Sequence, residues 1–101
     1  MEHERGDAMA YPVKLEYTVQ IWQEDGQFIA HAMPLDVMSS GPTVEAARGA
    51  LDEAVSLFLD TAAEVGTLEE VLEECGFDLH QGRWISPAWV SLERHSAVVR
   101  G

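Results

Sequence analysis

The chain has 101 residues, and its 18 aspartates and glutamates outnumber its six lysines and arginines to give a net charge of −12. Such a surface repels phosphate backbones and anionic lipids, so composition argues against direct binding of nucleic acid or of a membrane. It would instead attract a basic partner, although acidic residues also serve solubility alone. The length predicts one domain, and an apolar content of 47% is typical of a packed globular protein.

The cysteine content indicates a reducing compartment. Cys75 is the single cysteine of the sequence, so no internal disulfide can form. The first residues lack the apolar core of a signal peptide, and no apolar run approaches the roughly 20 residues that span a membrane. We expect a cytoplasmic protein with a flexible tail over residues 1–11 and a single domain over residues 12–101.

A β-hairpin is the first predicted element. Apolar and polar residues alternate over residues 13–21, which is the period of a half-buried strand. Asp25-Gly26 then supplies the positive φ angles of a two-residue hairpin turn, and this turn places Glu24 opposite Gln27. The face expected to point toward the core carries Val19, Ile21, Phe28, Ala30 and Ala32.

The opposite face of this hairpin is more apolar than a solvated face requires. It includes a tryptophan, and aromatic side chains anchor protein contacts. We interpret this face as an interface, with packing as the alternative for the tryptophan and an ordinary polar role as the alternative for the histidine. The face carries Gln20, Trp22, Ile29, His31 and Met33.

A third strand and a long helix follow the hairpin. Pro34 ends the second strand because proline cannot donate to the ladder, and residues 37–40 form a short third strand before Gly41. Thr43 is a good N-cap for a helix that Gly66 ends. This order predicts an α+β fold in which the helix covers a three-stranded antiparallel meander. The apolar stripe of the helix consists of Val44, Ala47, Leu51, Ala54, Val55, Phe58 and Ala62.

The C-terminal third is harder to interpret. Thr67 and Glu70 match a capping box and predict a short second helix, which runs to about Cys75 and ends at Gly76. Glycine and proline interrupt residues 77–95, which argues against regular elements there. The Ala-Val-Val run at residues 97–99 can add a final strand to the sheet.

The sequence gives little evidence of a catalytic or metal-binding site. The four histidines lack the spacing of a metal-binding pair, and we expect neither a metal nor a cofactor. Cys75 follows a helix C-terminus, where the helix dipole opposes a thiolate, so we interpret it as structural. Acids on the second helix lie one turn apart and form either a solvated acidic face or a partner-binding patch. These pairs are Glu69 with Glu73 and Glu70 with Glu74.

One stretch of about 60 residues combines several features that resemble a known family. They are the hairpin sequence YTVQIWQEDGQFIAHAMP, the strand end SSG, the cap GPT with Gly41 and Thr43, and the helix positions Glu45, Ala47, Leu51, Glu53 and Ala54. With these features residues 17–77 resemble the HicB antitoxin family, in particular its short HicB-like members. The resemblance implies a β-β-β-α-β core, which is a degraded RNase H-like sheet without nuclease activity. It also implies binding to HicA, a small basic toxin that cleaves mRNA and whose RNA-binding surface the antitoxin blocks.

Three hypotheses follow. The first is a HicB-like antitoxin, or an antitoxin-derived protein, that binds and neutralises a basic HicA-type toxin. Its steering residues would be Asp60, Glu64, Glu70 and Glu74. The second is a solitary homo-oligomeric module without a toxin. In both cases a homodimer or higher oligomer would form through the sheet and use Trp22, Ile29, His31 and Met33. The third is an enzyme with a residual RNase H-like site, for which Asp25 and Asp36 are the candidate carboxylates.

Overall fold

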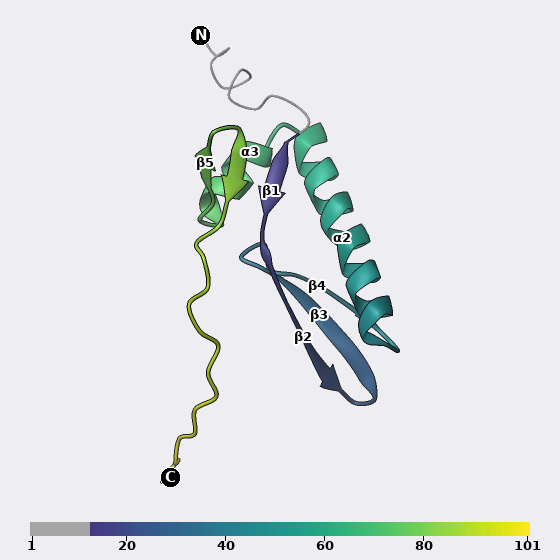
Figure 1. The fold of residues 1–101 in the computed structure, drawn as a ribbon, viewed down its shortest axis with the longest axis vertical. Coiled ribbons are helices and arrows are strands. Elements are labelled where there is room, and N and C mark those ends of the chain that lie inside the picture. Colours follow the sequence, from purple (N-terminus) through teal and green to yellow (C-terminus); the bar gives the residue numbers. More distant parts are fainter. Residues whose placement is uncertain (1–12) are drawn as a thin grey trace.

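The computed structural model describes residues 13–101 and confirms the predicted α+β class (Figure 1). The predicted tail over residues 1–11 lies outside the described residues. Two sheets are formed: the meander sheet has the strand order β2-β3-β4, and the small sheet has the order β1-β6-β5. The strands are β1 (Lys14–Glu16), β2 (Thr18–Glu24), β3 (Gln27–Met33), β4 (Val37–Gly41), β5 (Asp78–His80) and β6 (Arg83–Ile85), and the helices are α2 (Val44–Glu64) and α3 (Leu68–Glu74).

The meander sheet has the predicted register. Glu24 pairs with Gln27 and Ile21 pairs with Ala30 across the β2–β3 hairpin. The turn Asp25-Gly26 has φ angles of 52° and 79°, the left-handed values that a primed two-residue turn requires. Because side chains alternate along a strand, this register decides which face of the hairpin points toward the core.

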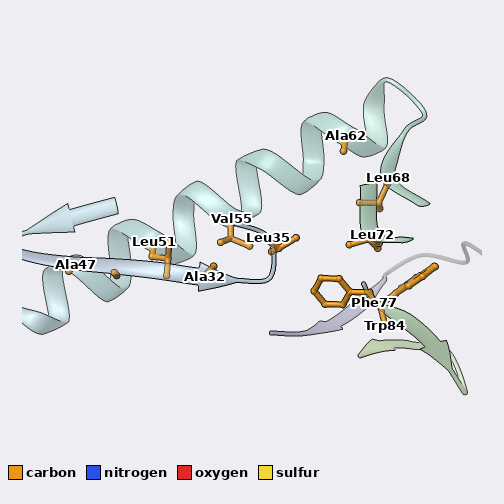
Figure 2. Packing of buried hydrophobic residues seen from close by; sticks show 11 residues of the cluster. Ala32, Leu35, Ala47, Leu51, Val55, Ala62, Leu68, Leu72, Phe77 and Trp84 are labelled. Carbon is orange, nitrogen blue, oxygen red and sulfur yellow. The ribbon is translucent and has the colours of Figure 1, made fainter. Parts of the chain in front are cut away.

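The larger part of the core lies between α2 and the meander sheet (Figure 2). Ala32 of β3 is fully buried, and so are Ala47 and Leu51 of α2. Since an alanine side chain ends at its methyl group, the helix can lie close above the strands, with Leu51 filling the space between. Phe58 belongs to the predicted apolar stripe and was expected to face the core, but it lies at the exposed margin of the helix.

The small sheet corrects two sequence-based expectations. The alternating segment 13–21 is not one strand, because it is divided at Tyr17, and β1 pairs in parallel with β6 instead of continuing in the meander sheet. Residues 77–95 were expected to lack regular elements, yet they contain the β5–β6 hairpin. Its turn is Gln81-Gly82, with φ angles of 51° and 81°, so the glycine that suggested an interruption in fact closes a hairpin.

The short helix α3 supports the small sheet. Leu72 of α3 is fully buried, and it packs in one cluster with Phe77 and with Trp84 of β6 (Figure 2). The predicted capping box is wrong, because Thr67 makes no side-chain cap bond and its Oγ1 donates instead to the carbonyl of Ala62 at 3.5 Å. The stability of α3 therefore depends on the burial of its leucines rather than on a side-chain cap bond in its first turn.

The cap of the long helix has a measurable consequence. Thr43 Oγ1 accepts a hydrogen bond from the Ala46 amide at 3.0 Å, as predicted. Thr43→Ala is therefore expected to lower the free energy of unfolding by about 1 kcal/mol. Thr67→Ala removes no cap bond and is expected to cost less than about 0.5 kcal/mol. Urea denaturation followed by tryptophan fluorescence measures both, and equal losses would contradict this assignment of the caps.

Residues 86–101 form an extended segment, which we call the C-terminal arm. It begins where β6 ends and runs away from the small sheet without forming a helix or a strand (Figure 1). The final strand expected at residues 97–99 is therefore absent from this conformation, and its two valines are exposed. No helix within residues 13–101 has the length and apolar content needed to cross a bilayer.

Candidate interaction surfaces

The outer sheet face is the side of the meander sheet that points away from α2. It carries Gln20, Trp22, Ile29, His31 and Met33, the same residues that the alternation predicted. Trp22 pairs with Ile29 across the hairpin, and the Trp22 and His31 rings meet edge to face with their centroids 6.3 Å apart. All five side chains are half-buried. The structure thus brings together the sheet residues that sequence analysis selected.

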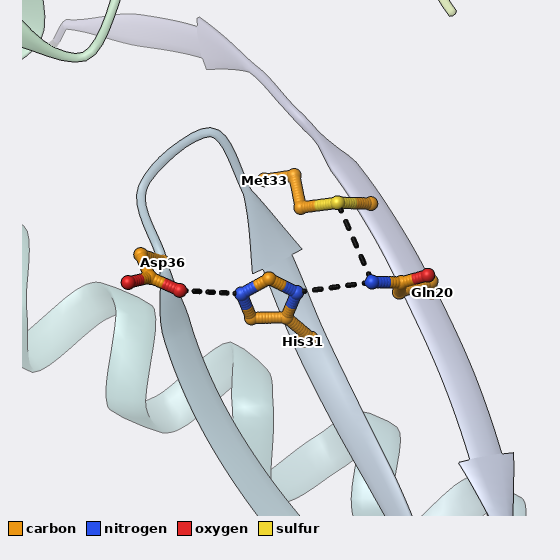
Figure 3. Close-up of polar contacts among 4 residues, drawn as sticks. All are labelled: Gln20, His31, Met33 and Asp36. Atoms are coloured by element: carbon orange, nitrogen blue, oxygen red, sulfur yellow. Dashed lines mark hydrogen bonds and ion pairs between the residues drawn. The ribbon is translucent and has the colours of Figure 1, made fainter. Parts of the chain in front are cut away.

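His31 is held from both sides by polar neighbours (Figure 3). The amide nitrogen of Gln20 lies 3.2 Å from His31 Nδ1 and also donates to Met33 Sδ at 3.5 Å. On the other side, His31 Nε2 lies 2.7 Å from Asp36 Oδ1. Because an amide nitrogen only donates, Nδ1 accepts, and the ring proton on Nε2 is donated to Asp36. The network therefore fits one arrangement of donors and acceptors, with Nδ1 accepting and Nε2 donating.

Both ring nitrogens of His31 are occupied in this network. Its side chain is 16% exposed, whereas that of Asp36 is 84% exposed. The Asp36 backbone adopts φ 65° and its amide donates to the Ala32 carbonyl at 2.8 Å, so the turn itself presents the carboxylate to the ring. This arrangement fastens the β3–β4 turn to β2, and it leaves the imidazole without a free nitrogen for a metal or a substrate proton.

Two residues of this surface were missed at the sequence level. Asp36 was named only as a candidate carboxylate of the third hypothesis, and its bond to His31 depends on the tight return of the chain after Pro34, which no spacing rule encodes. Met38 of β4 pairs with His31 and extends the exposed apolar surface onto the third strand. The period of two in residues 37–41, taken with the hairpin register, is the signal that could have placed Met38 there.

The four predicted steering acids lie on the helices and not on the outer sheet face. Asp60 and Glu64 occupy the last turns of α2, Glu70 and Glu74 belong to α3, and all four are exposed. None of them forms an ion pair with another residue in the range 13–101. Because α2 covers the opposite side of the meander sheet, the structure separates the predicted site residues into two surfaces. We call these four residues the acidic helix surface.

Cys75 stands beside the acidic helix surface and remains a thiol. It is half-buried behind α3. Burial raises the pKa of the Cys75 thiol above its ordinary value, and the charges of Glu74 and Asp36 raise it further. A protonated thiol is a weak nucleophile, so this environment agrees with a structural role for the residue.

The carboxylates of the third hypothesis are far apart. Asp25 lies in the turn before β3, and Asp36 lies in the turn after it. The seven residues of β3 separate the two turns by roughly 20 Å, which is too far for one metal ion or one water to bridge them. Within residues 13–101 no group of three or more histidines, cysteines or acids is placed to hold a metal ion.

Comparisons with known proteins assign no family to this chain. No model of a protein family, no curated protein and no solved structure matches the chain. The features available for a functional argument are therefore the acidic helix surface, the outer sheet face and the exposed C-terminal arm.

Proposed function

We propose that this chain is a HicB-like antitoxin that binds and neutralises a small basic, mRNA-cleaving toxin of the HicA type. The observation that carries the proposal is the charge of the two helices. Between residues 44 and 74, Arg48 is the single basic residue, and it stands against nine acids. The acids are Glu45, Asp52, Glu53, Asp60, Glu64, Glu69, Glu70, Glu73 and Glu74.

The position of these acids adds to their field. Neither α2 nor α3 has a basic residue in its last turn, where the helix dipole itself presents partial negative charge. Glu64 and Glu74 therefore increase this negative potential, which lowers the stability of an isolated monomer. Carboxylates placed against the dipole and left exposed favour a role in contact with cations from another molecule.

Neutralisation follows from competition for one surface. A toxin that cleaves mRNA must bind a phosphate backbone with lysine and arginine side chains. Carboxylates on two helices would compete for the same side chains and would steer the encounter from a distance. Bound in this way, the antitoxin excludes RNA without any chemistry of its own. The proposal therefore requires no catalytic group in this chain.

The proposal is tested by charge reversal. We expect the basic protein encoded beside this chain to co-purify with it at about 0.05 M salt and to dissociate at about 0.3 M salt. The double variant Glu70→Lys/Glu74→Lys is expected to weaken the complex by at least about tenfold at low salt and to reduce its salt dependence. Isothermal titration calorimetry measures the affinity, and a growth assay with the toxin measures neutralisation.

A matched control separates local contact from overall charge. Glu45→Lys/Glu53→Lys changes the net charge by the same amount, but in the first half of α2. A loss of affinity confined to the Glu70/Glu74 pair supports the acidic helix surface as the toxin site. Unchanged affinity of that pair at low salt would refute it, and equal losses in both pairs would reduce it to a general effect of charge.

The outer sheet face favours a second candidate, a homo-oligomeric module without a toxin. Trp22, Ile29 and Met33 form an apolar surface that α2 does not cover, and Met38 adds an exposed side chain to it. Both candidates therefore include self-association through the sheet. They differ in the neighbouring gene: a small basic protein favours the antitoxin, and its absence favours the solitary module.

A further inference from the structure

The C-terminal arm exposes apolar side chains in a way that a free monomer would not favour. Val90 is 97% exposed and Leu92 is 74% exposed, and near the end of the arm Val98 and Val99 are 77% and 90% exposed. These four large apolar side chains lie within ten residues of each other and contribute nothing to the core. An apolar segment with this pattern gains stability only when another surface covers it.

The backbone of the arm is also unpaired. No backbone hydrogen bond connects residues 86–101 to any other residue of the described chain. An extended segment with free amides and carbonyls can add to the open edge of a sheet, where it gains a ladder of hydrogen bonds. The arm thus presents both properties of a donor strand: an extended backbone and side chains that seek burial.

A suitable acceptor exists on the meander sheet. β2 is an edge strand, because β3 occupies only one of its sides. A groove of about 280 Å³ lies at the start of this edge, between Thr18, Val19, Gln20 and Met33 on the sheet and residues 89–92 of the arm. The beginning of the arm therefore lies across this groove from the acceptor edge, next to the outer sheet face. Beyond Leu92 the arm continues without a partner (Figure 1).

The reach of the arm argues for a second molecule as the acceptor. Sixteen extended residues span roughly 50 Å, whereas the seven residues of β2 span only roughly 20 Å. An arm of this length extends past its own sheet and can cover the corresponding edge of a neighbouring copy. When two copies are related by a two-fold axis, each donates its arm to the other, so the exchange closes on itself.

Charge complementarity favours the same acceptor. The arm carries Arg94 and Arg100 against one acid, Glu93, in a protein whose net charge is −12. Within residues 13–101 neither arginine forms an ion pair, whereas Glu93 is already held by His95 at 2.8 Å and by Ser91 at 2.7 Å. The arm therefore carries more basic than acidic side chains, in contrast to the chain as a whole. It can approach the acidic body of a second copy, while two bodies repel each other.

We infer that the C-terminal arm of one copy docks along β2 and the outer sheet face of a second copy, and that the reciprocal exchange forms a homodimer. This inference rests on the self-association included in the proposed function and not on toxin binding. It identifies the occupant of the outer sheet face as the same chain. It also assigns a role in dimer formation to residues 86–101, which belong neither to the core nor to the acidic helix surface.

Sedimentation velocity of the full-length protein tests the inference. The wild-type chain is expected to sediment as a dimer, and Val90→Asp/Leu92→Asp is expected to raise the dissociation constant by at least about 100-fold. The control Leu57→Asp/Val65→Asp places the same charges at exposed apolar positions on and just after α2, and is expected to remain dimeric. Circular dichroism checks that both variants keep their helical content.

Three outcomes separate this inference from the proposed function. A wild-type monomer at about 100 μM would overturn both the exchange and the self-association. A dimer that persists in Val90→Asp/Leu92→Asp would overturn the exchange and leave self-association through the sheet intact. A dimer that dissociates in the arm variant but not in the control supports the exchange, whether or not a toxin is found.

A crosslinking experiment distinguishes docking on a second copy from docking on the arm's own sheet. Thr18→Cys is placed in one tagged chain and Leu92→Cys in another, both with Cys75→Ser, because Thr18 and Leu92 line the same groove. Mixing and mild oxidation are expected to give a disulfide between the two different chains. Failure of this pair, with an internal disulfide in a chain carrying both cysteines, would overturn the exchange.

Discussion

Gly41→Ala is expected to lower the free energy of unfolding by about 2–3 kcal/mol, a large part of the stability of a small domain. Gly41 is buried at the end of β4, where the chain turns into α2. A Cβ atom there would lie 2.8 Å from the Ala47 amide nitrogen and 2.9 Å from both the carbonyl carbon and the Cβ of Ala46. The neighbours are mainly backbone atoms, so the strain can be relieved only by moving the first turn of the helix away from the sheet.

A glycine-to-alanine substitution eight residues later, at Gly49, is expected to change the free energy of unfolding in the opposite direction. Gly49 lies inside α2 and a Cβ atom there meets nothing within 4 Å. Gly49→Ala is therefore expected to stabilise the protein by about 1 kcal/mol through helix propensity. Urea denaturation of the two variants, followed by circular dichroism at 222 nm, measures both changes. Destabilisation of similar size at both positions would contradict the packing described for the β4–α2 junction.

Leu51→Ala is expected to cost about 3–5 kcal/mol. Leu51 is completely buried between α2 and the meander sheet, and its neighbours there include Ala32 and Ala47. Alanine side chains are short and held by rigid elements, so they cannot move in to fill the volume that the leucine leaves. The loss therefore combines the lost burial of the side chain with the cost of a cavity.

Leu57 provides the matched control for this prediction. It lies on the same helix and its side chain is 68% exposed. Leu57→Ala is expected to change the free energy of unfolding by less than about 0.5 kcal/mol. Thermal and urea unfolding of both variants test the pair. A cost above about 2 kcal/mol for Leu57→Ala would place it in a buried interface instead.

The meander sheet and α2 could be predicted because local chemistry determines them. Asp25-Gly26 permits one hairpin turn, and that turn alone fixes every pair between β2 and β3. Thr43 marks the start of α2 through a hydrogen bond made within one helical turn. Signals of this kind act over a few residues, so they can be recognised in the sequence without knowledge of the fold.

The small sheet could not be predicted because its determinants are distant. Its strands have three residues each, which is too short for a visible period. β1 is separated from its partner by most of the chain, so the break at Tyr17 has no local cause. The burial of Trp84 depends on Leu72 and Phe77, which the fold brings to it.

The candidate surfaces also contain features that the sequence predicts and features that it does not. The alternation placed Trp22 and His31 on the outer sheet face, because face membership depends only on the register. The bond between His31 and Asp36 depends on the shape of a turn, and it was missed. Thr67 illustrates the reverse case: a matching local motif is overridden when the hydroxyl finds a carbonyl of the preceding helix.

The parallel pairing of Leu15 with Trp84 has a consequence for the order of events during synthesis. The two residues are about 70 positions apart, so β1 has no partner until β6 has been synthesised and has left the ribosome. The β2–β4 meander and α2 involve contacts of much shorter separation and can assemble first. A nascent chain that stalls before Trp84 would hold a formed meander and an unpaired β1. Synthesis of β6 then completes the small sheet, and the arm emerges after it.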